Sequence, residues 1–281
     1  MTTGTCLCGA VRYEIDGPFS FMGHCHCSMC RKSHGSLFAT WAAAPLSGFR
    51  WISGEDAVET YASSAEGHRA FCRHCGSVTP IVTGDMIVAP AGNLEGDLGI
   101  SPQLHMFVAS KPDWDEITDD LPQYPGWPPG LDMPSVERET PPAREGAAHG
   151  SCLCGDVTWE VEGPPAMMFH CHCSRCRRAR GASFATNAFY AFAQFRWLGG
   201  EDRLAHFKLP DAKAFTQDFC RRCGSPVPRV MPEHDRVMLP VGAMDCAPGR
   251  AVDAHIYAGS KAPWDAITDA LPQFEERPTR R

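Results

Sequence analysis

The sequence predicts a mostly β protein made of two tandem copies of one small domain. The first observation is an internal repeat: CLCGAVRYEIDGP, which begins at Cys6, returns as CLCGDVTWEVEGP at Cys152. HCHCSMCRKSHGSLFAT, which begins at His24, returns in the same way as HCHCSRCRRARGASFAT at His170. The second observation is an alternation of apolar and polar residues inside the repeat, and the third is a set of closely spaced cysteines that occurs twice. A repeat of this length indicates a duplicated domain and not a short-period solenoid.

The alternation favours strands. In GAVRYEIDG the apolar Val11, Tyr13 and Ile15 alternate with polar residues, which is typical of a half-buried strand. FATWAA, FRWISG, ETYASS, MIVAPAG and LHMFVAS are further candidates, so we expect seven or eight short antiparallel strands in each copy. WDEITDDL and WDAITDAL, near the end of each copy, are expected to form a single helical turn.

The repeat sets the domain boundaries. We expect a first domain at residues 1–121 and a second at residues 150–274, joined by a linker at residues 122–149. The linker segment is rich in proline and poor in periodic apolar residues, which favours extended conformations. The alternative is an ordered arm that packs on one domain through Trp127 and Leu131.

Composition excludes several classes of protein. The chain is 43% hydrophobic and 21% charged, as in globular domains. A net charge of −7 without a long basic run argues against nucleic-acid binding, and no apolar run approaches the ~18 residues of a membrane helix. The N-terminus has no signal-peptide pattern, so we expect a cytoplasmic protein. In that compartment 15 closely spaced cysteines indicate metal binding more than disulfides.

Seven cysteines in each copy form three motifs, CxC, CxCxxC and CxxC. Structural zinc takes four ligands, and residues i and i+2 of a strand share a face, so a CxC pair and a CxxC turn can complete one site. Metal that closes this long loop contributes to the folding free energy. The predicted four-sulfur sites are Cys6, Cys8, Cys72 and Cys75, and Cys152, Cys154, Cys220 and Cys223.

The CxCxxC triplet can converge on a second ion and leave one coordination position open, as in a catalytic zinc site. The sequence thus predicts two zinc ions per domain and four per chain. A histidine as fourth ligand, or an iron–sulfur cluster, is the alternative. The predicted catalytic sulfurs are those of Cys25, Cys27, Cys30, Cys171, Cys173 and Cys176. The histidines considered as a fourth ligand, or as packing residues, are His24, His26, His170 and His172.

Other residues recur beside these motifs. Cations that follow each triplet can offset thiolate charge, meet a substrate carboxylate or simply be solvated; they are Arg31, Lys32, Arg177 and Arg178. A lysine and a tryptophan recur near the end of each copy, in a functional or a core role, as Lys111, Trp114, Lys261 and Trp264. The fifteenth cysteine, Cys246, replaces Gly96 of the first copy, and we expect it to be an ordinary small side chain.

Taken together, the motifs GxCxCGxVxYE, HCHCxxCRKxxG, FCxxCGS and HxFxxSKxxW resemble those of the family of glutathione-dependent formaldehyde-activating enzymes and centromere protein V. The resemblance covers nearly all of both copies. It implies a β-tent fold similar to that of Mss4 proteins in each copy. It also implies a structural zinc on each four-cysteine set and an active-site zinc on each triplet.

The same resemblance implies a zinc-dependent carbon–sulfur lyase or synthase that joins glutathione to formaldehyde and gives S-hydroxymethylglutathione. The expected partners are therefore a small thiol and a small aldehyde, and the sequence carries no signal for an oligomeric state. The rival hypothesis is a non-catalytic zinc scaffold that binds a protein or another partner. It predicts a saturated triplet, whereas the enzyme hypothesis predicts an open one.

Overall fold

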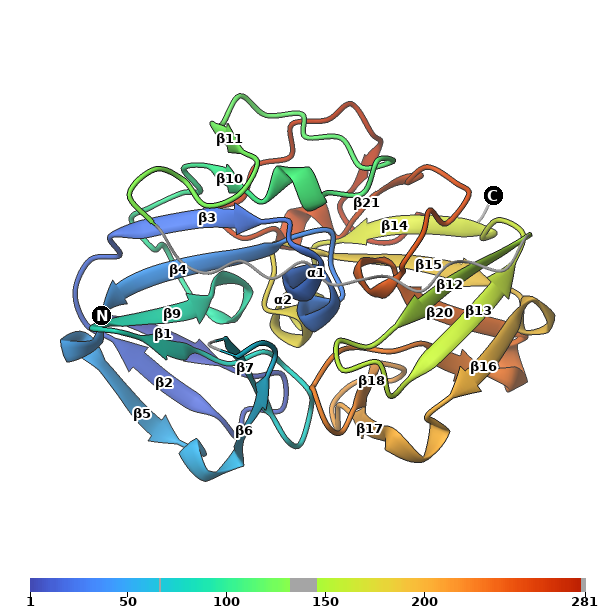
Figure 1. The fold of residues 1–281 in the computed structure, drawn as a ribbon, viewed down its shortest axis with the longest axis horizontal. Coiled ribbons are helices and arrows are strands. Elements are labelled where there is room, and N and C mark those ends of the chain that lie inside the picture. Colours follow the sequence, from blue (N-terminus) through green and yellow to red (C-terminus); the bar gives the residue numbers. More distant parts are fainter. Residues whose placement is uncertain (66, 132–145, 279–281) are drawn as a thin grey trace.

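The chain folds into two halves that repeat the same arrangement of strands (Figure 1). The structure is a computed structural model that describes residues 1–65, 67–131 and 146–278. We call residues 1–131 the first half and residues 146–278 the second half. Each contains a three-stranded sheet, a six-stranded sheet and a two-stranded hairpin. The predicted fold class, mostly β with two tandem domains of one type, is confirmed.

The strands of the first half form two sheets and a hairpin, in which neighbouring strands pair in the following order. The three-stranded sheet contains β1 (Thr2–Thr5), β2 (Arg12–Ile15) and β5 (Phe49–Ser53). The six-stranded sheet contains β11 (Gln123–Tyr124), β10 (His105–Met106), β3 (Phe21–Cys25), β4 (Ala39–Pro45), β9 (Met86–Pro90) and β8 (Ile81–Thr83). The hairpin consists of β6 (Val58–Ala62) and β7 (His68–Cys72).

The second half repeats this order. Its three-stranded sheet contains β12 (Ala147–Ser151), β13 (Thr158–Glu162) and β16 (Phe195–Gly199). Its six-stranded sheet contains β22 (Gln273–Phe274), β21 (Ala254–Ile256), β14 (Met167–Cys171), β15 (Ala185–Tyr190), β20 (Arg236–Pro240) and β19 (Arg229–Met231). Its hairpin consists of β17 (Leu204–Lys208) and β18 (Thr216–Cys220).

One short helix follows the third strand of each half: α1 (Ser28–His34) and α2 (Ser174–Arg180). Each ends at a glycine in the left-handed region, Gly35 at φ 59° and Gly181 at φ 62°. Glycine adopts this conformation without steric cost, and the chain can then turn directly into the next strand.

Two details differ from the sequence prediction. The described residues of each half form eleven strands, and β10 and β11 run parallel to their neighbours, so the large sheet is mixed. WDEITDDL and WDAITDAL form no helix. The Lys111 ammonium instead donates to the carbonyl oxygens of Pro112 and Asp115, which stabilises a tight turn, and residues 115–122 after it form no regular element.

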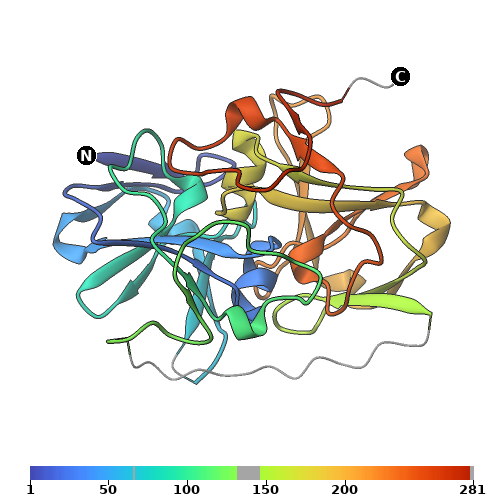
Figure 2. The ribbon, with the colours of Figure 1, turned by 90° about the horizontal axis from the view of Figure 1, so that it is seen from above.

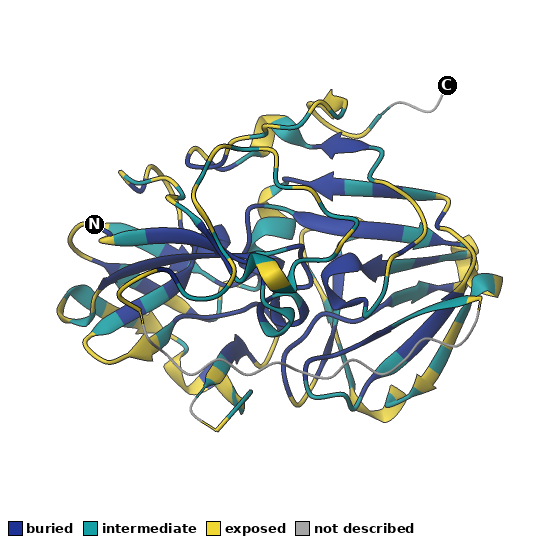
Figure 3. Ribbon diagram, turned by 45° about the horizontal axis from the view of Figure 1, so that its top comes forward, coloured by how far each residue is buried: buried dark blue, intermediate teal, exposed yellow. Residues whose placement is uncertain are grey.

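The core of each half lies between its two larger sheets, and Figure 3 shows that buried residues are concentrated in the strands of these sheets. Tyr13 and Ile15 of β2 are at most 1% exposed and pack with Met22 of β3 and Ile87 of β9. The alternation predicted for this strand therefore places its apolar residues inside.

The two halves share these cores. Both helices lie at the centre of the molecule, where the halves meet (Figures 1 and 2). Leu37 of the first half belongs to the core of the second, and Trp264 of the second belongs to the core of the first. The equivalent residues Phe38 and Phe184 meet edge to face at 5.3 Å. The halves are therefore packed about a pseudo-two-fold axis.

The segment expected as a linker, residues 122–149, is described at 122–131 and 146–149. Near its start, β11 pairs with β10 of the first half, and at its end residues 147–149 belong to β12, which pairs with β13 of the second half. Trp127 packs edge to face on Phe107 at 4.9 Å, whereas Leu131 is 41% exposed. Trp127 is thus attached to the first half, as the ordered-arm alternative expects. The prolines at 134, 141 and 142 lie outside the described residues.

Candidate metal centres

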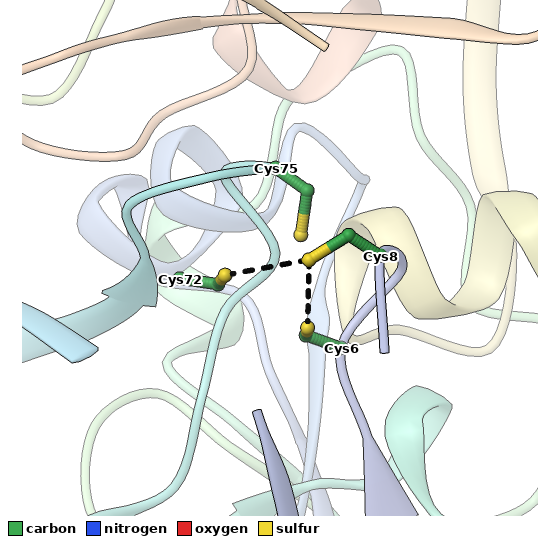
Figure 4. Close-up of side chains that lie close together, drawn as sticks. All are labelled: Cys6, Cys8, Cys72 and Cys75. Carbon is green, nitrogen blue, oxygen red and sulfur yellow. Dashed lines mark hydrogen bonds between the residues drawn. The ribbon is translucent and has the colours of Figure 1, made fainter. Parts of the chain in front are cut away.

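Four cysteine sulfurs converge in each half between the first strand and the hairpin (Figure 4). In the first half, Cys6 and Cys8 lie in the turn after β1, Cys72 ends β7, and Cys75 lies in the turn that follows. The Sγ atoms of Cys6 and Cys8 are 3.4 Å apart, and those of Cys8 and Cys72 are 3.8 Å apart. All four sulfurs lie within 4.8 Å of one another.

This geometry fits zinc. With Zn–S bonds of about 2.3 Å, the edge of a tetrahedron of sulfurs is about 3.8 Å. The second half repeats the arrangement, with Sγ separations of 3.4 Å between Cys152 and Cys154 and 3.6 Å between Cys154 and Cys220, and Cys223 completes the group. The Val11 backbone N–H also donates to the Cys6 sulfur at 3.4 Å, as a thiolate acceptor would require.

Three sulfurs converge at the junction of the third strand and the helix. Cys25 is the last residue of β3, Cys27 caps α1, and Cys30 lies in its first turn. The Cys30 backbone N–H donates to Cys27 Sγ at 3.3 Å, so the strand-to-helix turn itself holds the sulfurs together. The second half forms the same group from Cys171, Cys173 and Cys176. Each triplet spans at most 4.8 Å and contains only sulfur ligands, so it also fits a zinc ion.

In each triplet, hydrogen bonds between the sulfurs lower the pKa of one thiol. Hydrogen bonds from Cys25 and Cys27 hold the pKa of Cys30 well below the usual thiol range, against the effect of burial. In the second half, hydrogen bonds from Cys171 and Cys176 lower the pKa of Cys173 to about 3. Since the thiolate is the form that binds metal and acts as a nucleophile, both triplets are prepared for either role.

The histidines beside the triplets belong to a separate hydrogen-bond network. His26 Nε2 and His105 Nδ1 are 2.8 Å apart, and His105 Nε2 lies 3.0 Å from the Asp119 carboxylate. The second half repeats this chain with His172, His255 and Asp269. His24 and His170 pair with threonine hydroxyls at 3.0 and 2.9 Å. Among the described residues, no histidine nitrogen joins the sulfurs of either triplet.

Sequence reasoning did not assign a role to the outer members of this network. His105 and Asp119 lie in a block that recurs in the second copy at the same internal spacing. That repetition is the signal that could have found them. His105 pairs with His26, which lies between Cys25 and Cys27, and its strand β10 pairs with β3, so this block holds the chain on which those two sulfurs lie.

The cations that follow the triplets have different roles. Arg31 Nε donates to the His26 carbonyl at 3.2 Å and Arg31 Nη2 donates to the Ser110 carbonyl at 3.3 Å, and Arg177 repeats both bonds. Lys32 is 4% exposed and lies 2.5 Å from Asp245 of the other half. Arg178 forms the equivalent pair with Glu95, also at 2.5 Å, but their side chains are 36% and 46% exposed. Arg178 is therefore partly solvated, whereas Lys32 is buried.

Comparison with known proteins shows the family to which the chain belongs. The sequence profile of the glutathione-dependent formaldehyde-activating enzymes matches residues 1–110 and 147–260. The chain belongs to the glutathione-dependent formaldehyde-activating enzyme family. Each half of this family member carries one match, which confirms the predicted duplication.

Three known proteins are similar to parts of this chain. A Halomonas elongata protein whose name assigns it to these enzymes is 30% identical over 127 residues, which cover 41% of this chain and 79% of the relative. A Schizosaccharomyces pombe protein described as an uncharacterized lyase is 30% identical over 26% of this chain and 52% of its own length. A crystal structure of a Rhodobacter sphaeroides protein is 31% identical, covers 34% of this chain and 89% of that chain, and has a TM-score of 0.28.

A cavity of 280 Å³ lies between the two halves of this family member. It is lined by Gly92 and Glu95 from the first half and by Arg177 and Arg178 from the second. Arg177 directly follows Cys176, so the cavity lies beside the second triplet's helix. No helix in the described part of the chain has the length and apolar character needed to cross a membrane.

Proposed function

We propose that the protein is a zinc-dependent carbon–sulfur lyase or synthase that joins a thiol, glutathione, to a small aldehyde, formaldehyde. The observation that carries the proposal is the pairing, in both halves, of a four-sulfur cluster with a three-sulfur cluster. The family membership and the names of the relatives support lyase chemistry. All 15 cysteines are free, which supports a reducing compartment such as the cytoplasm.

The two kinds of cluster would divide the work. The four-sulfur sets would hold a structural zinc that joins the start of each half to its hairpin, and the triplets would hold the active-site zinc, two ions per half and four per chain. A zinc ion on a triplet would supply Lewis acidity and one open coordination position. Cys25, Cys27 and Cys30 would hold it in the first half, and Cys171, Cys173 and Cys176 in the second.

The reaction needs no oxidant. The thiol sulfur forms a bond to the aldehyde carbon, and the thiol proton ends on the carbonyl oxygen. The site would favour the thiolate form of the substrate thiol at neutral pH and would hold the two reactants close together. Arg178 lines the cavity between the halves and its side chain is 36% exposed, so it would meet a carboxylate of glutathione there by exchanging its ion pair with Glu95.

The test compares one cysteine of each cluster type. We expect Cys27→Ser combined with Cys173→Ser to leave a folded chain with two zinc ions and no acceleration of adduct formation. Cys72→Ser should instead unfold the first half, because it opens the loop closed by the four-sulfur cluster. Elemental analysis measures the zinc content, circular dichroism measures folding, and exchange NMR of glutathione with formaldehyde measures the rate of adduct formation. Exchange NMR is needed because the adduct also forms without catalyst.

The rival hypothesis of a non-catalytic scaffold predicts the opposite pattern. A saturated triplet would make Cys27→Ser as damaging to folding as Cys72→Ser. The proposed enzyme activity would likewise be wrong if the fully metallated wild-type protein left the exchange rate between glutathione and formaldehyde equal to the rate without protein.

A further inference from the structure

A cation lies beside each triplet, but it comes from a different element in the two halves. In the first half it is Arg69 of β7, whose Nη2 donates to Cys30 Sγ at 3.7 Å. The same position of β18 is Gln217, which carries no charge. In the second half the cation is Arg180, at the end of α2, where the first half has His34. Arg180 is 3% exposed and interacts electrostatically with Cys176.

The two cations differ in what surrounds them. Burial lowers the pKa of Arg69, but the charges of the three sulfurs of its triplet, Cys30, Cys27 and Cys25, outweigh it and raise that pKa overall. Because an arginine side chain stays protonated in proteins, this triplet keeps a full positive charge at its edge.

Arg180 lacks this arrangement. It interacts electrostatically with the carboxylate of Asp218 as well as with Cys176. Asp218 also pairs with His206 at 2.5 Å and interacts with Arg229. The first half has Ala70 in place of Asp218. Among the described residues, Arg180 donates no hydrogen bond to the sulfurs, and its Nη1 has no partner. Arg180 therefore acts on its triplet beside a carboxylate and without a hydrogen bond to the sulfurs, whereas Arg69 donates directly to Cys30 and has Ala70 where the second half has that carboxylate.

This difference matters for the thiol substrate. A divalent ion on three thiolates carries one net negative charge, and a fourth thiolate adds a second. Charges interact strongly in a buried site of low effective dielectric. A positive group that is not offset lowers the cost of the extra charge.

We propose that Arg69 is a positioning residue that makes the triplet of the first half the preferred site for an anionic thiol, so that the two halves are not equivalent. The proposal rests on the proposed function. His34 interacts electrostatically with Cys30, but burial lowers the pKa of His34 to about 4, so it is neutral at pH 7 and adds no positive charge.

The test uses the whole chain loaded with ¹¹³Cd in place of zinc, observed by ¹¹³Cd NMR, because each cluster then gives its own resonance. Additional thiolate ligands move a ¹¹³Cd resonance downfield, so a triplet that accepts a thiol moves toward the four-sulfur position. The probe is 2-mercaptoethanol, and loss of one line in Cys173→Ser assigns the triplet of the second half. We expect the triplet of the first half to respond at about tenfold lower thiol concentration than that of the second.

Four variants separate charge from structure. Arg69→Gln, which copies Gln217, should remove the preference, and Arg69→Lys should retain most of it. Asp218→Asn should lower the thiol concentration needed by the second triplet. Arg50→Gln, which removes an exposed cation paired with Glu14, is the matched control and should change nothing.

Each other outcome has a defined meaning. The inference is wrong if both triplet resonances move together in the wild type, if the second moves first, or if neither Arg69→Gln nor Asp218→Asn alters the order. If no triplet resonance exists, or if neither moves at any thiol concentration, the open position of the proposed function fails and the inference fails with it. Equal movement of both lines contradicts the inference alone.

Discussion

At the level of single residues, the interface between the halves contains two equivalent ion pairs in different surroundings. Lys32 and Asp245 are buried, with side chains 5% and 2% exposed, and the Lys32 ammonium also donates to the Ser151 carbonyl and hydroxyl. Arg178 and Glu95 occupy the equivalent place but remain partly exposed. Removal of one partner from a buried pair leaves an unpaired charge, whereas an exposed pair contributes little.

We therefore expect Lys32→Met to lower the free energy of unfolding by about 3–5 kcal/mol. Arg178→Met, the matched control, should change it by about 1 kcal/mol or less. Lys32→Met combined with Asp245→Leu should recover much of the loss, because no charge is then left buried. Urea denaturation of the metallated protein measures all three, and equal losses in the two single variants would contradict this explanation.

At the level of elements, two short 3₁₀ turns let the helices approach the opposite half. Gly242 lies in η8 (Val241–Ala243), which packs against α1, and Gly92 lies in η3 (Ala91–Asn93), which packs against α2. A Cβ atom at Gly242 would meet the backbone of Ser36, and one at Gly92 would meet the backbone of Ala182. A flexible side chain could change its rotamer to make room for the added Cβ atom, but backbone atoms cannot.

Gly242→Ala and Gly92→Ala should each therefore destabilise the protein by about 1–3 kcal/mol through overpacking. Gly126→Ala is the control, because a Cβ atom there has no neighbour within 4 Å. Thermal unfolding followed by circular dichroism is the measurement. A transition temperature in Gly242→Ala that equals that of Gly126→Ala would show that the helix and the 3₁₀ turn are not in close contact.

The sequence predicts the elements and the sulfur groups well, because both depend on local spacing. Alternation placed Tyr13 and Ile15 inside, and the cysteine motifs named the groups that the structure brings together. Arg69 could not be found in this way, since it reaches Cys30 only through the packing of a hairpin from another part of the chain, and Gln217 replaces it in the second copy. The helical turn at WDEITDDL was wrong because the Lys111 side chain satisfies the carbonyl groups there.

At the level of the whole molecule, each half completes the core of the other. Leu37 and Trp264 are 2% and 5% exposed only because they insert across the interface, and Thr118 Oγ1 meets its equivalent, Thr268 Oγ1, at 2.6 Å. An isolated half would expose such apolar residues to water, which favours association.

Cleavage of the chain between residues 131 and 146, at an inserted protease site, should thus leave the halves together. Sedimentation of the cleaved protein should match that of the intact chain, whereas either half expressed alone should self-associate or aggregate. Separation of the cleaved protein into two stable monomers would contradict an interface of this strength.

Covalent fusion also removes a constraint that a dimer of identical chains must obey. In such a dimer every substitution appears on both sides of the axis at once, so a lysine that suits one side is imposed on the other. In this chain Lys32 faces Asp245 while Arg178 faces Glu95, and Cys246 lies where the other half has Gly96. A duplicated gene can in this way change the metal centre of one half while the centre of the other half keeps its original residues.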